Sequence, residues 1–575
     1  MQTDDHIGVQ GGGIDARNRP LRADDVLRDA YRLFAQGDVT AAERALAQLW
    51  SDTSHAPAAA LHLLGHVRRR QHRVPEAERY LRRAIDAEPS LPHHHAALGD
   101  LLSDVGLHAP AKDSYAEAAL LDPRSPEVRL AVARCAMALG LFLEAEQAAR
   151  AAIALAPSRK AWELLAQALG SQDRLVEALD AVSHAVALDP ANPDTLLLQA
   201  NIQARNGDND LALSSIDRLI AHGRATPPVM LSRGVTLANM ARLPDAQESF
   251  ADAVARWPDH VELQRALANA RWMSGERERF SRDFEAAVER NPGDVRMRIA
   301  CADLLRRSDF RDKSEILLRD GLARAPEDLA LLQSMGVLLD ELDRTAEGLE
   351  LLRAAHARAP NDPTIRANLV CALLRLGRGD EALTEIAPLR RSQPLNQEWI
   401  CYETMALRQL GDPRYHDLCD FDLMVRPYQL SAPNGFATIE AFNDALADSL
   451  RQLHVLEAHP LDQSVRGGSQ TSRSLLHVHD PIIQMFLKIL DDPIRAYIDA
   501  MGAPDPNHPW SGRKTGEYRL TGAWSVKLKP GGFHINHVHP EGWISGPYYV
   551  KVPTVVAEGT GQQGWVTFGE PRWPT

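Results

Sequence analysis

The chain repeats one pattern of apolar and polar positions about every 34 residues. Within one unit, apolar residues three or four positions apart form two stripes: Leu61, Leu64 and Val67, then Ala77, Leu81 and Ile85. This spacing puts the side chains on one face of an α-helix. Each unit therefore predicts a pair of amphipathic helices. Because one pair cannot bury its own apolar face, the pairs are expected to stack into a solenoid.

Two positions in each unit hold mostly small residues, which marks places where two helices approach too closely for a large side chain. The later position is occupied by Ala77, Ala111, Ala145, Ala178, Ala212, Ala246, Phe280, Ser314, Gly348 and Ala382. The earlier position is occupied by Gly65, Gly99, Ala133, Ala166, Ala200, Gly234, Ala268, Ala302, Gly336 and Val370. Phe280 and Ser314 break the rule, so we expect looser packing around them. Proline recurs at the unit ends, as at Pro89 and Pro123, where it stops the second helix.

The period and the two small positions resemble the tetratricopeptide repeat over roughly residues 24–422. The resemblance implies an α-helical solenoid of about eleven to twelve helix pairs. It also implies a protein or peptide partner, which such arrays usually bind along the repeat groove. The run His93, His94 and His95 lies at an expected helix start. Three adjacent histidines cannot all face one metal ion, so we predict a solvated face for this run.

The 34-residue repeat ends after about residue 423, and residues 423–575 are expected to form a second domain. Two helices are predicted first, around 439–458 and 481–501, with an ordered Gly/Ser/Gln loop between them. Short aromatic and β-branched segments then predict strands at 523–530, 532–540, 543–553 and 564–570. This pattern is typical of half a barrel or jelly roll. Residues 1–23, acidic and rich in glycine, are expected to be a flexible segment.

Composition narrows the class of protein. The formal net charge of −13 disfavours nucleic acid and anionic membranes as partners. The sequence has no run of about 18 apolar residues, and its N-terminus lacks the features of a signal peptide. Five cysteines without paired spacing predict free thiols in a reducing compartment. A cytoplasmic location is therefore expected.

Candidate chemistry is concentrated in the segment GGFHINHVHPEGWISGPYYV. On an extended strand His537 and His539 would share one face, and His534 would point to the other. Two imidazoles two residues apart on one face can bind the same metal ion. The pattern predicts a metal site at His537 and His539.

The segments QSVRGGSQT, WSVKLKPGGFHINHVHPEGWISGPYYVKVP and GWVTFGEP resemble the 2-oxoglutarate/Fe(II) oxygenases found fused behind tetratricopeptide repeats in bacteria. The resemblance covers roughly residues 440–575 and implies a mainly β jelly roll, the double-stranded β-helix. It implies Fe(II) as cofactor, 2-oxoglutarate as cosubstrate and dioxygenase activity. In that family's pattern His537 takes the first ligand position, and His539 stands where a carboxylate is usual. Glu541 is an alternative ligand, as part of an H-x-E after His539, although Pro540 would bend the strand there.

Arg466 has two interpretations. Its guanidinium could bind a carboxylate of the cosubstrate or substrate, or it could tie its own loop to the barrel together with Gln463 and Gln470.

Only four strands are predicted, where a jelly roll needs about eight, and the sequence has no histidine after His539. The domain is therefore expected to be incomplete, either because the chain is a fragment of a longer protein or because it is a degenerate half-barrel. Two alternatives to the oxygenase stay open. One is a non-catalytic repeat scaffold. The other is a cupin-type metalloenzyme, because Gly531, His537 and His539 match the start of the cupin pattern.

Overall fold

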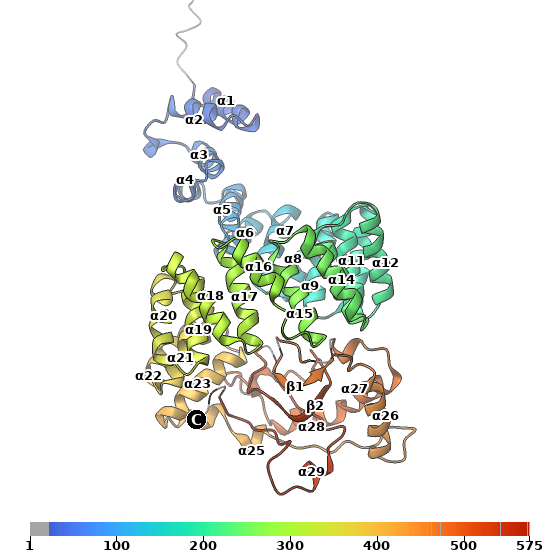
Figure 1. Ribbon diagram of the computed structural model, residues 1–575. Helices are drawn as coiled ribbons and strands as arrows, with labels where there is room; N and C mark the ends of the chain where they lie inside the picture. Colours follow the sequence, from blue (N-terminus) through green and yellow to red (C-terminus); the bar gives the residue numbers. More distant parts are fainter. Residues whose placement is uncertain are drawn as a thin grey trace, which may run out of the picture. The chain divides into compact units, whose positions relative to one another are not determined.

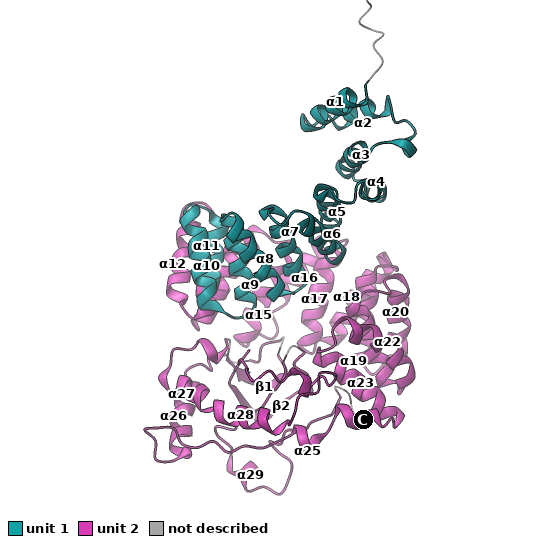
Figure 2. Ribbon diagram, turned by 180° about the vertical axis from the view of Figure 1, so that it is seen from behind, with its two compact units in different colours: residues 1–202 teal, residues 203–575 magenta. Residues whose placement is uncertain are grey.

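The computed structural model describes residues 22–456, 458–461, 463–471, 473–540, 542–571 and 573. Most of the predicted flexible segment 1–23 therefore lies outside the described residues. The chain divides into two compact units, residues 1–202 and residues 203–575 (Figure 2). The predicted domain boundary at residues 422 and 423 stays a prediction.

The first unit consists of paired helices that follow the 34-residue period. They are α1 (Ala23–Ala35), α2 (Val39–Ala47), α3 (Ala58–Arg70), α4 (Val74–Ala87), α5 (Pro92–Asp104), α6 (His108–Leu121), α7 (Pro126–Ala138), α8 (Phe142–Leu155), α9 (Arg159–Ser171) and α10 (Leu175–Leu188). Helix α11 (Pro193–Asn206) crosses the boundary between the units. Proline begins α5 and α7, where its missing N–H has no intrahelical partner to lose.

The second unit continues the helix pairs and ends in the C-terminal region (Figure 1). Its repeat helices are α12 (Asn209–Ala221), α13 (Pro227–Asn239), α14 (Leu243–Arg256), α15 (Val261–Met273), α16 (Arg282–Arg290), α17 (Val295–Arg307), α18 (Arg311–Arg324), α19 (Leu329–Glu341), α20 (Thr345–Arg358), α21 (Pro363–Arg375), α22 (Gly379–Ser392) and α23 (Gln397–Leu410). Short helices α24 (Arg414–Leu418) and α25 (Phe421–Met424) follow. The predicted solenoid is confirmed.

The small positions lie where the two helices of a pair touch. A Cβ atom on Gly65 would lie 2.6 Å from Leu81 Cγ, and one on Gly234 would lie 2.2 Å from Phe250 Cε1. Real Cβ atoms do not approach so closely, so the glycines allow the helices to pack at this separation.

The expectation of looser packing at Phe280 and Ser314 is wrong. Phe280 is 2% exposed and its ring meets Trp272 edge-on, with 5.3 Å between ring centroids. Helix α16 begins only after Phe280, so the large ring fills space beside the preceding helix. Ser314 is fully buried and donates a 2.8 Å hydrogen bond to Ala302 O, which satisfies its hydroxyl.

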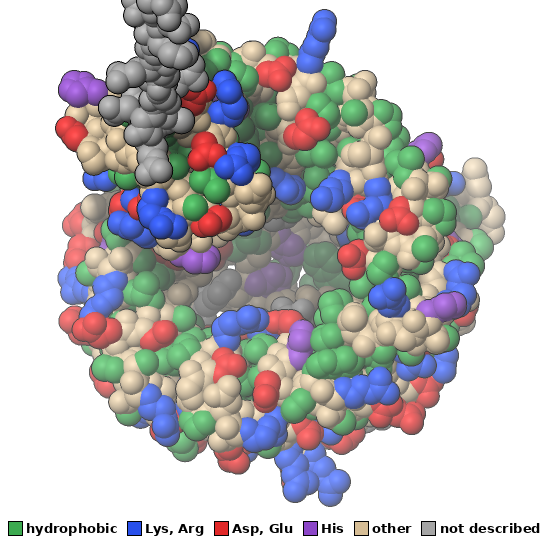
Figure 3. Space-filling model, turned by 90° about the horizontal axis from the view of Figure 1, so that it is seen from above, with side chains coloured by type: hydrophobic (Ala, Val, Ile, Leu, Met, Phe, Trp, Pro, Cys, Tyr) green, Lys and Arg blue, Asp and Glu red, His purple; other side chains and the backbone are tan. Residues whose placement is uncertain are grey.

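Charged side chains link neighbouring helices. Arg174, before α10, contacts Glu146 of α8, a buried carboxylate, at 2.6 Å, and it also contacts Glu177 of α10. Lys and Arg side chains lie interspersed with Asp and Glu over the face seen in Figure 3. Exposed ion pairs contribute little individually, so the buried apolar stripes carry most of the stability of the array.

The C-terminal region contains the predicted helices and a small sheet. Helix α26 (Ile439–Arg451) covers only the first part of the predicted span 439–458, and the span 481–501 contains two helices, α27 (Pro481–Ile489) and α28 (Asp491–Ala500), instead of one. Strand β1 (Val465–Gln470) pairs antiparallel with β2 (Val526–His534), and a short helix α29 (Thr554–Ala557) follows. Among the described residues this is the whole sheet, an incomplete β domain.

The loop prediction and the four strand predictions for this region are wrong in detail. The Gly/Ser/Gln segment expected to be a loop contains β1. The two strands expected at 523–530 and 532–540 are one strand, β2, which ends at His534. The described residues 543–553 and 564–570 contain no strand. Intrinsic β-propensity depends strongly on the neighbours that a segment finds, and these last segments pair with none.

No helix in the described ranges has both the length and the apolar character needed to cross a lipid bilayer.

Candidate functional site

The candidate residues are positioned by the β1–β2 pair and its glycines. Val465 lies opposite His534 and Arg466 lies opposite Phe533, with a bulge between Arg466 and Gly468. Gly467 has a φ of 64°, in the left-handed region that favours glycine. A Cβ atom on Gly532 would lie 2.3 Å from Gly467 O. The glycine-rich sequences therefore allow the two backbones to approach closely here.

His534 is the last residue of β2, and His537 and His539 follow the strand rather than lie on it. The expectation that strand alternation sets their directions is therefore wrong. The structure still places the two rings near each other, with 5.1 Å between ring centroids. His537 Nδ1 lies 2.9 Å from Ile535 O. If Nδ1 donates that hydrogen bond, Nε2 keeps the lone pair that a metal needs.

His539 and His534 have partners of their own. The ring of His539 stacks on Trp524 at 5.5 Å between centroids, with 14° between the planes. His534 Nδ1 lies 2.9 Å from Ser464 Oγ, the residue before β1. Burial, with a smaller contribution from His537, lowers the pKa of both His534 and His539. A lowered pKa favours the neutral imidazole, which is the form that ligates metals.

A repeat helix holds the segment that carries these histidines. Gln397 N, at the start of α23, donates a 2.9 Å hydrogen bond to Pro540 O. Asn536 Nδ2 donates a hydrogen bond of 2.6 Å to Pro571 O. Arg408 of α23 donates to Gly569 O at 3.2 Å. The candidate site therefore lies against the last long helix of the repeat array.

Arg466 binds its own loop. Its guanidinium donates hydrogen bonds to Gln463 O at 2.7 Å and to Val465 O at 2.9 Å. Gln470 Nε2 donates to Gln463 Oε1 at 3.2 Å. These contacts match the interpretation in which Arg466, Gln463 and Gln470 order the loop. The role of Arg466 in binding a carboxylate stays a prediction.

His454 has a position that the sequence did not indicate. Its Nδ1 lies 2.8 Å from Ser469 Oγ of β1, and its Nε2 lies 2.9 Å from Ser525 Oγ just before β2. Burial, and then Lys527, lowers its pKa. His454, which follows α26, joins the two strands through these hydrogen bonds, and no motif in the sequence links residues so far apart.

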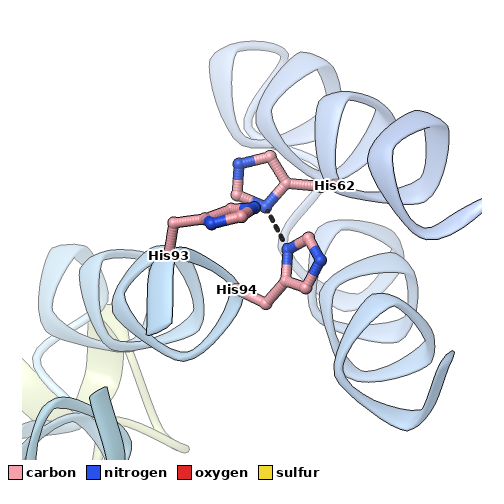
Figure 4. Close-up of side chains that lie close together, drawn as sticks. All are labelled: His62, His93 and His94. Atoms are coloured by element: carbon pink, nitrogen blue, oxygen red, sulfur yellow. Dashed lines mark hydrogen bonds between the residues drawn. The ribbon is translucent and has the colours of Figure 1, made fainter. Parts of the chain in front are cut away.

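The prediction of a solvated face for the run at residues 93–95 is wrong for His94. His94 is fully buried, and its Nδ1 lies 3.0 Å from Nδ1 of His62 in the preceding repeat (Figure 4). His93 joins the same cluster, whereas His95 Nε2 lies 2.9 Å from Pro89 O. The sequence did not reveal this cluster, because His62 lies about one repeat before the run.

Three parts of the chain match tetratricopeptide-repeat families, at residues 96–193, 231–295 and 341–400. Residues 522–573 match the family described as "Putative 2OG-Fe(II) oxygenase". Parts of the chain therefore contain tetratricopeptide repeats, and a C-terminal segment matches the oxygenase family. The resemblance drawn from the sequence is thereby confirmed.

Solved structures resemble parts of the repeat region. One from Parabacteroides merdae is 18% identical and covers 42% of this chain and 96% of its own, with a TM-score of 0.36. MamA from Desulfovibrio magneticus is 20% identical and covers 29% and 96%, with a TM-score of 0.28. A thermophilic repeat protein from Thermus thermophilus is 23% identical and covers 31% and 98%, with a TM-score of 0.28. No curated protein matches the sequence.

His537 and His539 carry imidazole nitrogens, a ligand type that suits Fe(II), and their ring centroids lie 5.1 Å apart. Among the described residues, no third histidine, cysteine or carboxylate joins them in a cluster. Glu541, the alternative ligand, lies outside the described residues. A facial triad has three protein ligands, so Fe(II) binding by His537 and His539 would need one more.

Proposed function

We propose that the tetratricopeptide array binds a protein or peptide and presents it to an Fe(II)- and 2-oxoglutarate-dependent oxygenase site in the C-terminal region. His537 and His539 hold the Fe(II), and Arg466 or a group beside it receives the 2-oxoglutarate carboxylate. Bound Fe(II) with 2-oxoglutarate supplies the oxidising chemistry of this family. One observation carries the proposal: the family match includes both histidines, whose rings lie 5.1 Å apart.

The hydrogen bond between the histidine-bearing segment and α23 supports the proposal that a partner bound to the repeats can reach the metal. Pro540 is hydrogen-bonded to Gln397 of α23, so the two histidines are held beside a repeat helix. A peptide lying along the array at that point would come close to the metal without a long linker. Tetratricopeptide arrays generally bind protein or peptide partners, which supports this arrangement.

The test is an anaerobic titration of the full chain with Fe(II), followed by measurement of succinate formed from 2-oxoglutarate and O2. His537→Ala and His539→Ala should each weaken Fe(II) binding by at least about tenfold, because each removes a ligand. His534→Ala is the matched control and should leave binding unchanged. All variants carry His93→Ala, so that the histidine cluster of the first unit cannot hide the effect. Equal Fe(II) affinity with and without His537 and His539 would contradict the proposal.

Partner binding needs a separate readout. Peptides selected from a displayed random library against the full chain would be incubated with Fe(II), 2-oxoglutarate and O2. A mass gain of one oxygen atom on a selected peptide, absent with His537→Ala, is the expected result. Peptides that bind but are never oxidised would reject the catalytic part.

The second candidate is a non-catalytic scaffold, which the two-ligand donor set among the described residues favours. In that case the chain binds peptides and forms no succinate under any condition. Succinate formation that depends on His537 would rule this candidate out.

A further inference from the structure

A second group of histidines lies in the first unit, outside the C-terminal region. His62 is in α3, and His93 and His94 are in the first turn of α5, the equivalent helix of the next repeat. One ring nitrogen from each of the three lies within 4.8 Å of the others. Figure 4 shows the three rings converging from two helices on one point. We propose that His62, His93 and His94 bind a divalent transition-metal ion of the zinc class.

The distances suit a metal bound by imidazoles. His62 Nδ1 and His94 Nδ1 lie 3.0 Å apart. Two nitrogens bound to Zn²⁺ at about 2.0–2.1 Å lie about 3.3 Å apart in a tetrahedral site. An adjustment of a few tenths of an ångström therefore converts the observed pair into two ligands. The rings of His62 and His93 lie 5.0 Å apart and nearly perpendicular, which allows His93 to close the third position.

The outer nitrogens of the two buried ligands both lie near polar groups. His62 Nε2 lies 3.1 Å from His66 Nε2, one helical turn away in α3. His62 protonated at Nε2 donates to His66 and leaves its Nδ1 lone pair free for the metal. His94 Nε2 is buried and has no hydrogen-bond partner in the described part of the chain, and Glu88 Oε2 lies 4.0 Å away. A metal on Nδ1 puts the proton on Nε2, facing that carboxylate. A carboxylate beyond a ligating histidine is the usual support of such sites.

Exposure also favours an ion. His94 is fully buried and His62 is 9% exposed, whereas His93 is exposed, so an ion can enter from the side of His93 and keep a water as fourth ligand.

The site would link two consecutive repeats. An ion held by His62 on one side and by His93 and His94 on the other crosslinks α3 to α5. Because it binds only the folded array, it should stabilise this part of the first unit. The proposal does not depend on the C-terminal oxygenase function.

The test uses the full chain with His537→Ala and His539→Ala, so that the C-terminal pair cannot contribute. Titration calorimetry with Zn²⁺ should give one bound ion, and Co²⁺ should give the visible absorption of a tetrahedral complex. His93→Ala should weaken Zn²⁺ binding by at least about tenfold. His93 is exposed, so this variant is expected to fold. Glu88→Gln should weaken binding less, since it removes only the outer partner of His94.

His95→Ala is the matched control, because His95 neighbours the cluster but its Nε2 faces Pro89 O. It should leave the Zn²⁺ affinity and the Co²⁺ spectrum unchanged. Absence of Zn²⁺ binding would overturn the proposal and leave the cluster as a hydrogen-bonded chain of neutral imidazoles. Binding that survives His93→Ala, or that is lost with His95→Ala, would also overturn it.

Discussion

The indole nitrogen of Trp272, in repeat helix α15, donates a 2.9 Å hydrogen bond to the backbone carbonyl of His459, 187 residues later. The imidazole of His459 packs edge-on against the same indole, with 5.7 Å between centroids. Ala458 and Leu461 join the apolar cluster of α15, α16 and α17. The segment after α26 is thus part of the packing of the repeat array.

Replacing Trp272 by Phe tests this attachment. The change keeps an aromatic ring but leaves the buried carbonyl of His459 without its donor, which costs about 1–3 kcal/mol. We expect a lower free energy of unfolding in denaturant titrations, and faster proteolysis within residues 452–475. Trp162→Phe, where the ring stacks on His184 in the first unit, is the control and should not change cleavage there. Unchanged cleavage in the Trp272 variant would contradict a role in attachment.

The same contact predicts a dependence on pH. Burial, then Arg466 and Arg277, lowers the pKa of His459 to about 4, although Asp309 opposes them. The unfolded chain takes up a proton near pH 6.5, before the folded one does. This contribution to stability is therefore fully present above about pH 6.5 and is lost as the pH falls toward about 4.

The measurement is the free energy of unfolding against pH for the parent chain and for His459→Phe, which retains a ring against Trp272. The variant should lose less stability than the parent between pH 7 and pH 4. Parallel curves for the two proteins would show that His459 does not titrate in this way.

Local spacing made the repeats predictable, because each helix pair packs on its neighbours and every contact repeats along the chain. Ser314 shows the limit of that rule: its hydroxyl is satisfied by Ala302 O, a contact that a pattern of small residues does not reveal.

The candidate site was only partly predictable. The closeness of His537 and His539 follows from their spacing, but β1 forms from a glycine-rich segment of low strand propensity because β2 lies against it. The cluster of His62 and His94 depends on contact between repeats, which no single unit shows.

Because β1 and β2 approach closely, adding one methyl group between them is expected to lower both stability and Fe(II) affinity. An alanine at position 532 would place its Cβ 2.3 Å from Gly467 O, a backbone atom that moves only if the strands separate. Gly532→Ala should cost about 1–3 kcal/mol, as overpacked sites do, and should weaken Fe(II) binding at His537 by displacing the segment after β2. Gly546→Ala is the control, since a Cβ there has nothing within 4 Å. Denaturant unfolding and Fe(II) titration measure the two effects. Equal stability of both variants would mean that the strands separate freely.

The repeat interfaces predict a matching effect inside the array. Gly234 in α13 faces Phe250 in α14, and an added Cβ would lie 2.2 Å from Phe250 Cε1. Phe250 is 3% exposed, so its ring has little space into which it can move. Gly234→Ala should therefore destabilise the second unit by about 1–3 kcal/mol, although alanine is the better helix former by up to about 1 kcal/mol. Gly293→Ala, at an open turn, should be close to neutral. Thermal unfolding of the two variants decides whether close packing or helix propensity dominates. A higher unfolding midpoint for Gly234→Ala would mean that helix propensity outweighs the contact with Phe250. The small residue at this position would then not be required by close packing.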